Sequence, residues 1–189
     1  MTNFKIVVFL GVDGAGKSTL IESIIKKNKL KYKKVHFAPD YFRNKKNQVS
    51  NPHNKKYRGI IFSFLKISYW FINFQLFKLL NYHTNKVFIF DRYLYDVIID
   101  PLRYRILLSK KIKKFILKNF TKPDLIVFLT GDPIRIYTRK KELNLKDIIR
   151  LNKRYKSFVK KFDNKITLSC STRLDINRNK ISNYLKKIS

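Results

Sequence analysis

Cysteine is almost absent from this 189-residue chain, and acidic residues are few. The single cysteine, Cys170, excludes an internal disulfide and any zinc cluster built on cysteines, and the three histidines lack metal-ligand spacing. Glycine is scarce too, with 5 in the chain, and no Gly/Ser linker, repeat or composition break divides the sequence. We therefore expect a single domain over residues 1–189. No secretion signal is recognisable before Gly11, and together these absences predict a reducing, cytoplasmic setting.

The chain has 12 acidic residues and 43 lysines and arginines, which gives a formal net charge of +31. Such an excess is typical of proteins that bind nucleic acid or anionic membranes. Here, however, lysine is spread over nearly every segment together with abundant Asn, Ile, Phe and Tyr, as an A+T-rich coding sequence would produce. The rare acids are therefore the better guide to function. Those in loops or at helix starts are Asp13, Asp91, Asp96, Asp100, Asp124, Asp132 and Glu142.

Short apolar runs alternate with helical stretches along the chain. Strands are predicted at residues 5–10, 35–38, 87–90, 125–129 and 166–168. Helices are predicted at 17–28, 57–82, 93–100, 105–119, 133–140, 145–162 and 174–188. Such alternation is typical of an α/β fold in which a parallel sheet is covered by helices.

Residues 59–80 are long and apolar enough to be tested as a membrane span. Ser63, Lys66, Trp70 and Asn73 recur at three- and four-residue intervals, which places them on one narrow stripe of a helix. We therefore predict a soluble core helix whose polar stripe faces a cleft, and we expect no membrane partner.

Residues 11–19 read G-V-D-G-A-G-K-S-T, directly after an apolar strand and before a helical pattern. In that context the motif binds phosphate, because glycines let successive backbone N–H groups point at the β-phosphate and the helix start adds positive charge. Lys17 would reach the β/γ oxygens and Ser18 would ligate Mg²⁺. We predict ATP and Mg²⁺ as cofactors. The expected cofactor-binding residues here are Gly11, Asp13, Gly14, Ala15, Gly16, Lys17, Ser18 and Thr19.

A second motif, F-I-F-D-R-Y, covers residues 88–93. An acid at the carboxyl end of a buried parallel strand lies where Mg²⁺ and the transferring phosphoryl group must be. Asp91 is therefore predicted to hold the metal's water shell or to accept a proton. Arg92 can neutralise charge on an acceptor phosphate. The alternative for Asp91 is a plain helix cap.

These pieces resemble the P-loop kinases of the thymidylate kinase type. The resemblance also includes K-P-D-L-I-V-F-L-T-G-D-P at 122–133, T-R-K-K-E-L at 138–143 and a strand-turn-helix around Ser169. It implies a three-layer α/β/α P-loop fold of the nucleoside monophosphate kinase type, with a five-stranded parallel sheet and a short lid. It implies catalysis by Lys17, Asp91, Arg92 and Arg139, the last a lid cation that also contacts ATP.

The resemblance extends to substrate contacts. It implies that Asp13 lies near the acceptor sugar, that Phe62 stacks on the acceptor base with Lys66 following, and that Arg43 holds the acceptor phosphate. It places the loop with Ser171 beside the adenine. Some members carry an arginine in the phosphate loop where this chain has Gly14, and such a difference directs attention to the basic lid.

One segment departs from the family pattern. After D-R-Y the chain reads L-Y-D-V-I-I-D-P-L-R-Y-R, in place of a small-residue and Tyr-Gln pattern. Asp96, Asp100 and Arg103 could hold sugar hydroxyls and an anionic group, or form a structural salt-bridge network. The acceptor is expected to be dTMP, with a surface-polysaccharide or sugar precursor as the alternative. A third hypothesis is a basic nucleic-acid or membrane-surface binder with secondary NTPase activity. We expect nucleotide substrates as partners, no nucleic acid, and allow for a homodimer.

Overall fold

The computed structural model describes residues 5–188, except 28, 30, 37–52 and 54–55. Its centre is a five-stranded sheet in the order β2-β3-β1-β4-β5, with every pair of neighbours parallel. The strands are β1 (Lys5–Leu10), β2 (Tyr32–His36), β3 (Val87–Asp91), β4 (Leu125–Thr130) and β5 (Lys165–Ser169). The predicted sheet is thereby confirmed.

The three central strands consist almost entirely of buried apolar residues. Parallel strands covered on both faces show such continuous apolar runs, which is why they were recognisable in the sequence. In the register Phe9 lies opposite Asp91, and Leu10 lies opposite Phe128. The carboxyl ends of β1, β3 and β4 therefore meet at one edge, where the loop after β1 begins.

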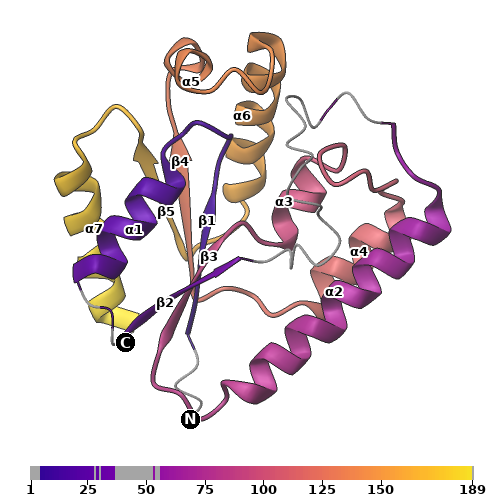
Figure 1. The fold of residues 1–189 in the computed structure, drawn as a ribbon, viewed down its shortest axis with the longest axis horizontal. Coiled ribbons are helices and arrows are strands. Elements are labelled where there is room, and N and C mark those ends of the chain that lie inside the picture. Colours follow the sequence, from indigo (N-terminus) through magenta and orange to yellow (C-terminus); the bar gives the residue numbers. More distant parts are fainter. Residues whose placement is uncertain (1–4, 28, 30, 37–52, 54–55, 189) are drawn as a thin grey trace, which may run out of the picture.

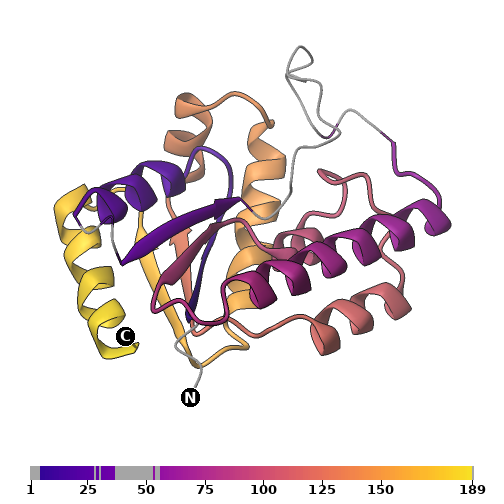
Figure 2. The same ribbon diagram turned by 60° about the horizontal axis from the view of Figure 1, so that its bottom comes forward.

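Helices cover both faces of the sheet (Figure 1), which gives the expected three layers. They are α1 (Lys17–Lys27), α2 (Ile60–Leu80), α3 (Leu94–Ile99), α4 (Lys110–Asn119), α5 (Pro133–Arg139), α6 (Leu145–Val159) and α7 (Leu174–Ile188). Helices α1 and α7 lie on one side of the sheet, and α2, α3, α4 and α6 on the other. Figure 2 shows α2 and α4 side by side, where Phe71 contacts Phe115 and Phe120.

Helix α2 corrects one prediction. By length and composition alone it is the one helix in the described part of the chain that could cross a membrane, yet only 22% of its apolar window is buried. It is therefore a core helix on one face only, where Ile67, Trp70 and Phe74 are buried. Its outer face exposes large apolar side chains such as Ile61, Leu65 and Ile72. Its polar stripe does have a partner: Lys66 and Trp70 contact Tyr104.

The segment before α4 is also different from the prediction. A helix was expected from residue 105, but residues 101–105 form a turn and α4 begins at Lys110, where Ser109 Oγ accepts a hydrogen bond from Ile112 N. Arg105 has a left-handed φ of 55°, which ends any regular helix there. Ser63 Oγ also accepts a hydrogen bond from Leu107 N, at 2.8 Å. This tertiary contact fastens the turn segment, residues 101–107, to α2.

Candidate active site

The phosphate-binding loop joins β1 to α1. Gly11, Gly14 and Gly16 all have positive φ, and Ala15 N donates to Val12 O at 3.2 Å, so the backbone curls as the motif requires. Lys17 is 5% exposed, and its Nζ donates to Gly11 O at 2.6 Å and Val12 O at 3.0 Å. The ammonium therefore lies over the loop, where a bound polyphosphate would meet it.

Gly14 allows α5 to approach the loop closely. With φ +86°, a Cβ at this position would lie 3.0 Å from Ile136 O and 3.2 Å from Lys140 Cβ. Some kinases that this sequence resembles carry an arginine at the corresponding place. In this chain the space beside Gly14 is taken by the end of α5.

Ser18 and Asp91 are brought together by the register of β1 and β3. Ser18 Oγ donates to Asp91 Oδ2 at 2.8 Å, and Lys34 Nζ lies 3.8 Å from the same oxygen. Asp91 is only 8% exposed. A hydroxyl and a carboxylate suit Mg²⁺, which prefers oxygen ligands and keeps several waters when phosphates complete its shell. The described residues contain no group of three or more His, Cys, Asp or Glu that could hold a metal alone.

Asp13 is surrounded by cations. Its carboxylate forms ion pairs with Arg92 and Arg103, and Lys17 Nζ lies 3.9 Å away. Burial alone would raise the pKa of Asp13, but the positive charges of Arg92, Lys17 and Arg103 outweigh it and hold that pKa well below its usual value. Burial lowers the pKa of Lys17 to about 8, although Asp13 raises it. Asp13 thus gathers three cations beside the loop.

Arg92 has the backbone conformation of a strained residue. Its φ is 88°, which for a residue with a side chain costs of order 1–3 kcal/mol. The turn after β3 directs its guanidinium to Asp13 on the neighbouring loop. Burial raises the pKa of the neighbouring Tyr104 above its usual value, although the positive charge of Arg92 lowers it.

Asp96 does not face a substrate cleft, so its expected substrate contact is wrong. The residue is fully buried, its Oδ2 accepts from Tyr93 N at 2.7 Å, and its Oδ1 accepts from Tyr155 OH at 2.6 Å. It caps α3 and links that helix to α6. Asp96 therefore has the structural role that was the alternative to substrate binding. Its hydrogen-bond partner Tyr155 was not predicted, because nothing in the sequence indicated it.

Asp100 lies just beyond the end of α3. Its Oδ2 is 2.9 Å from His53 Nε2, and its Oδ1 accepts from Arg103 N at 3.5 Å. Asp100 is 5% exposed, so it supports the turn that carries Arg103. Of the three residues expected to bind sugar hydroxyls or an anion, only Arg103 therefore reaches the phosphate-binding loop.

The lid consists of α5 and the residues that follow it. As predicted, Asp132 caps this helix by accepting from Ile134 N at 3.2 Å, with Pro133 in the first turn. Within the described residues the exposed Arg139 guanidinium makes no hydrogen bond or ion pair. Lys140 instead lies against Gly14 and helps to lower the pKa of Asp13. The Lys140 ammonium is paired with Glu142 at 3.0 Å, and the catalytic role of Arg139 stays a prediction.

Two of the remaining predicted contact residues, Phe62 and Ser171, lie in different parts of the described structure. Phe62 is 36% exposed, with the Arg58 guanidinium carbon 4.2 Å from its ring centre. Ser171 lies in the exposed turn after β5, where its N donates to Ser169 Oγ at 3.2 Å. Arg43 lies outside the described residues.

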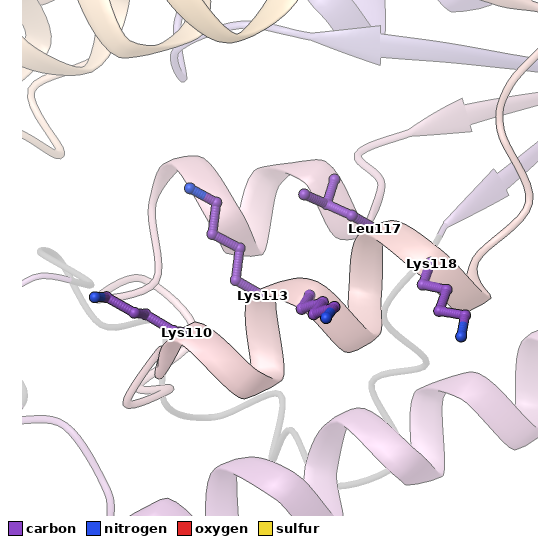
Figure 3. A pocket seen from close by; sticks show the side chains of 5 residues that line it. Lys110, Lys113, Leu117 and Lys118 are labelled. Carbon is purple, nitrogen blue, oxygen red and sulfur yellow. The ribbon is translucent and has the colours of Figure 1, made fainter.

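Figure 3 shows a surface hollow of about 470 Å³ on α4, away from these residues. It is lined by Lys110, Lys113, Lys114, Leu117 and Lys118. All five belong to one helix and none to the phosphate-binding loop or the strand ends, so this hollow is not part of the candidate active site.

The strand order, the glycine-rich loop after β1 and the acid at the end of β3 define a P-loop fold of the nucleoside monophosphate kinase type. Thymidylate kinase from Candida albicans shares this fold, with 16% identity and a TM-score of 0.70 over 99% of this chain and 93% of that chain. So does deoxyadenosine kinase from M. mycoides. Its structure with products dCMP and a flexible dCDP has 17% identity and a TM-score of 0.60, covering 97% of this chain and 100% of that chain.

The same M. mycoides enzyme with bound dATP has 18% identity and a TM-score of 0.63, covering 96% of this chain and 99% of that chain. No protein-family model matches the sequence, and no curated protein sequence matches it significantly. At such low identities the likeness shows the fold alone.

Proposed function

We propose that this protein transfers the γ-phosphoryl group of ATP to a nucleoside monophosphate, and that the acceptor is dTMP. The observation that carries the proposal is the Ser18 to Asp91 hydrogen bond of 2.8 Å, beside the three cations gathered by Asp13. Phosphoryl transfer needs this combination of an oxygen-ligand pair for Mg²⁺ and positioned positive charge, with little covalent help from the protein.

Each group would have a distinct role. The loop N–H groups and Lys17 bind the β- and γ-phosphates, and Ser18 and Asp91 would hold Mg²⁺, which supplies charge neutralisation when bound. Arg92 and Arg103 would hold the acceptor phosphate, whose oxygen attacks the γ-phosphorus as the bond to the β-phosphate oxygen breaks and ADP leaves. Lys140 would close over the transferring group and exclude water.

A second candidate is a kinase of the same fold with a sugar or surface-polysaccharide precursor as acceptor. The turn segment favours it, because residues 101–107 pack on α2 beside the expected base-binding residues and bring in two arginines, Arg103 and Arg105. That arrangement differs from the small-residue and Tyr-Gln pattern typical of thymidylate kinases.

The exposed face of α2 supports a homodimer. Ile61, Leu65, Ile72 and Leu79 recur at heptad-like spacing along it and are 51–81% exposed together with Leu76 and Leu80. Such a seam is typical of helices that pair with another helix. In a chain with a net charge of +31 this apolar face is also where two copies would repel each other least.

The cytoplasmic location stays a prediction.

The test is a panel of dTMP, dUMP, other nucleoside monophosphates and sugar phosphates with ATP and Mg²⁺, scored by ADP release and by phosphorylated product. The Lys17→Ala variant serves as the inactive control for background ADP release. Asp91→Asn and Arg92→Ala should each lower kcat by about 10²–10³ while ATP still binds, as for loss of one preorganised charge at a transition state.

Lys140→Ala should lower kcat more than Arg139→Ala does, because Lys140 Cβ lies beside Gly14 of the loop. Lys118→Gln on α4 is the matched charge control and should have wild-type activity. Full activity of the Asp91 variant, or no product with any acceptor, would refute the proposed transfer.

A further inference from the structure

Three cations gather where the N-terminal end of α2 meets the turn segment. Arg58 N donates to Arg105 O at 3.0 Å, and Arg105 Nε donates to Lys56 O at 3.3 Å. Lys66 Nζ donates to Tyr104 O at 2.9 Å. These bonds hold Arg58, Lys66 and Arg105 side by side, although they come from two segments about forty residues apart in the chain.

Among the described residues, no acid pairs with this cluster. Burial, together with the charges of Arg58 and Arg105, lowers the pKa of Lys66 to about 8. Over the part of the chain that the structure describes, none of the three forms a salt bridge with a carboxylate. Arg92 and Arg103, in contrast, share Asp13. A cluster of like charges that lacks a counter-ion is suited to receive an anion.

Two aromatic rings orient the cations. The Arg58 guanidinium lies over the Phe62 ring at 4.2 Å, and Lys66 Nζ lies 5.0 Å from the centre of the Trp70 ring. Cation–π contacts of this kind hold a charge in place without neutralising it. The cluster therefore combines fixed charge with partly exposed apolar surface, which suits a small organic anion more than a simple ion.

Tyr104 connects this cluster to the cations at the phosphate-binding loop. Its carbonyl oxygen accepts from Lys66 Nζ. Although burial raises the pKa of its half-buried side chain, Arg92 and Arg103 are close enough for their charges to lower that pKa. Tyr104 thus lies next to members of both groups of cations.

We infer that Arg58, Lys66 and Arg105 form a second anion-binding site, and that the acceptor carries a carboxylate or phosphate there, at the end opposite the phosphate that Arg92 holds. This inference rests on the phosphoryl transfer proposed above, but it replaces dTMP as the acceptor by a molecule with two anionic groups. The turn segment would then select the acceptor.

Two matched pairs of acceptors test it: dTMP against 5-carboxy-dUMP, and galactose 1-phosphate against galacturonic acid 1-phosphate. Within each pair the second member replaces an uncharged substituent by a carboxylate. In at least one pair we expect the carboxylate member to have a kcat/KM at least about tenfold higher, the effect of one charge-assisted hydrogen bond. Calorimetry should give the same ratio in Kd.

The double variant Arg58→Gln/Arg105→Gln should bring that ratio close to one. Lys110→Gln/Lys114→Gln, which removes the same charge from α4, should keep the wild-type ratio. If no acceptor is phosphorylated but the carboxylate members still bind more tightly, the proposed function fails and the anion site stands. If no pair shows a preference in binding or turnover, or if the arginine variant keeps it, the inference is overturned.

Discussion

Replacing Gly14 by alanine tests whether α5 packs on the phosphate-binding loop as the structure shows. Gly14 and Gly16 have almost the same φ, +86° and +87°, so alanine at either position suffers the same backbone strain. The two positions differ in their surroundings. A Cβ at Gly14 would be 3.0 Å from Ile136 O, whereas a Cβ at Gly16 meets nothing within 4 Å. The pair of variants therefore separates strain from contact.

The expected magnitudes follow from these two terms. Left-handed backbone costs a residue with a Cβ about 1–2 kcal/mol, and this penalty applies to both variants. Crowding against α5 adds about 1–3 kcal/mol for Gly14→Ala only. Gly59→Ala has neither problem, because φ at Gly59 is −56° and nothing lies within 4 Å, so it should stay within about 0.5 kcal/mol of wild type.

The assay is chemical denaturation followed by circular dichroism, without nucleotide, on the wild type and the three alanine variants. Thermal midpoints should follow the same order, at roughly 2–4 °C per kcal/mol for a chain of this size. Gly14→Ala should also lower kcat, because the displaced α5 carries Lys140 away from the loop. If Gly14→Ala and Gly16→Ala lose equal stability, α5 does not pack on Gly14 and the lid assignment fails.

Two further predictions concern charge and assembly. Because burial lowers the pKa of Lys17 to about 8 and nucleotide phosphates raise it again, ATP binding at pH 8 should take up as much as about 0.5 proton. Calorimetry in buffers of different ionisation enthalpy measures this uptake, which Lys17→Arg should lack; a wild type without uptake would contradict the buried ammonium. Ile72→Glu should convert a dimer to a monomer in light scattering, weakening association at least about a hundredfold, whereas Leu174→Glu on α7 should not. A monomeric wild type would refute pairing through α2.

The sheet and the phosphate-binding loop could be predicted because their signals are local. The apolar runs of β1, β3 and β4 are continuous, as buried parallel strands require, and the glycine spacing of residues 11–16 sets the loop geometry. Once the strands are parallel, their carboxyl ends must meet at one edge. This rule alone brings Asp91 beside Ser18, and the structure places the two in hydrogen-bond contact.

The contacts that decide specificity could not be predicted, because they join segments far apart in the chain. Nothing near Asp96 in the sequence shows that the hydroxyl of Tyr155, 59 residues later, donates a hydrogen bond to its Oδ1. In the same way, nothing shows that Asp13 pairs with Arg103, 90 residues away. Residues 105–107 were predicted as the start of a helix, but in the structure they continue a turn that a hydrogen bond joins to α2. Local periodicity and motif spacing thus determined the class of fold and the phosphate site. Side-chain partners across the sheet edge, which depend on packing and burial in three dimensions, were decided only by the tertiary structure.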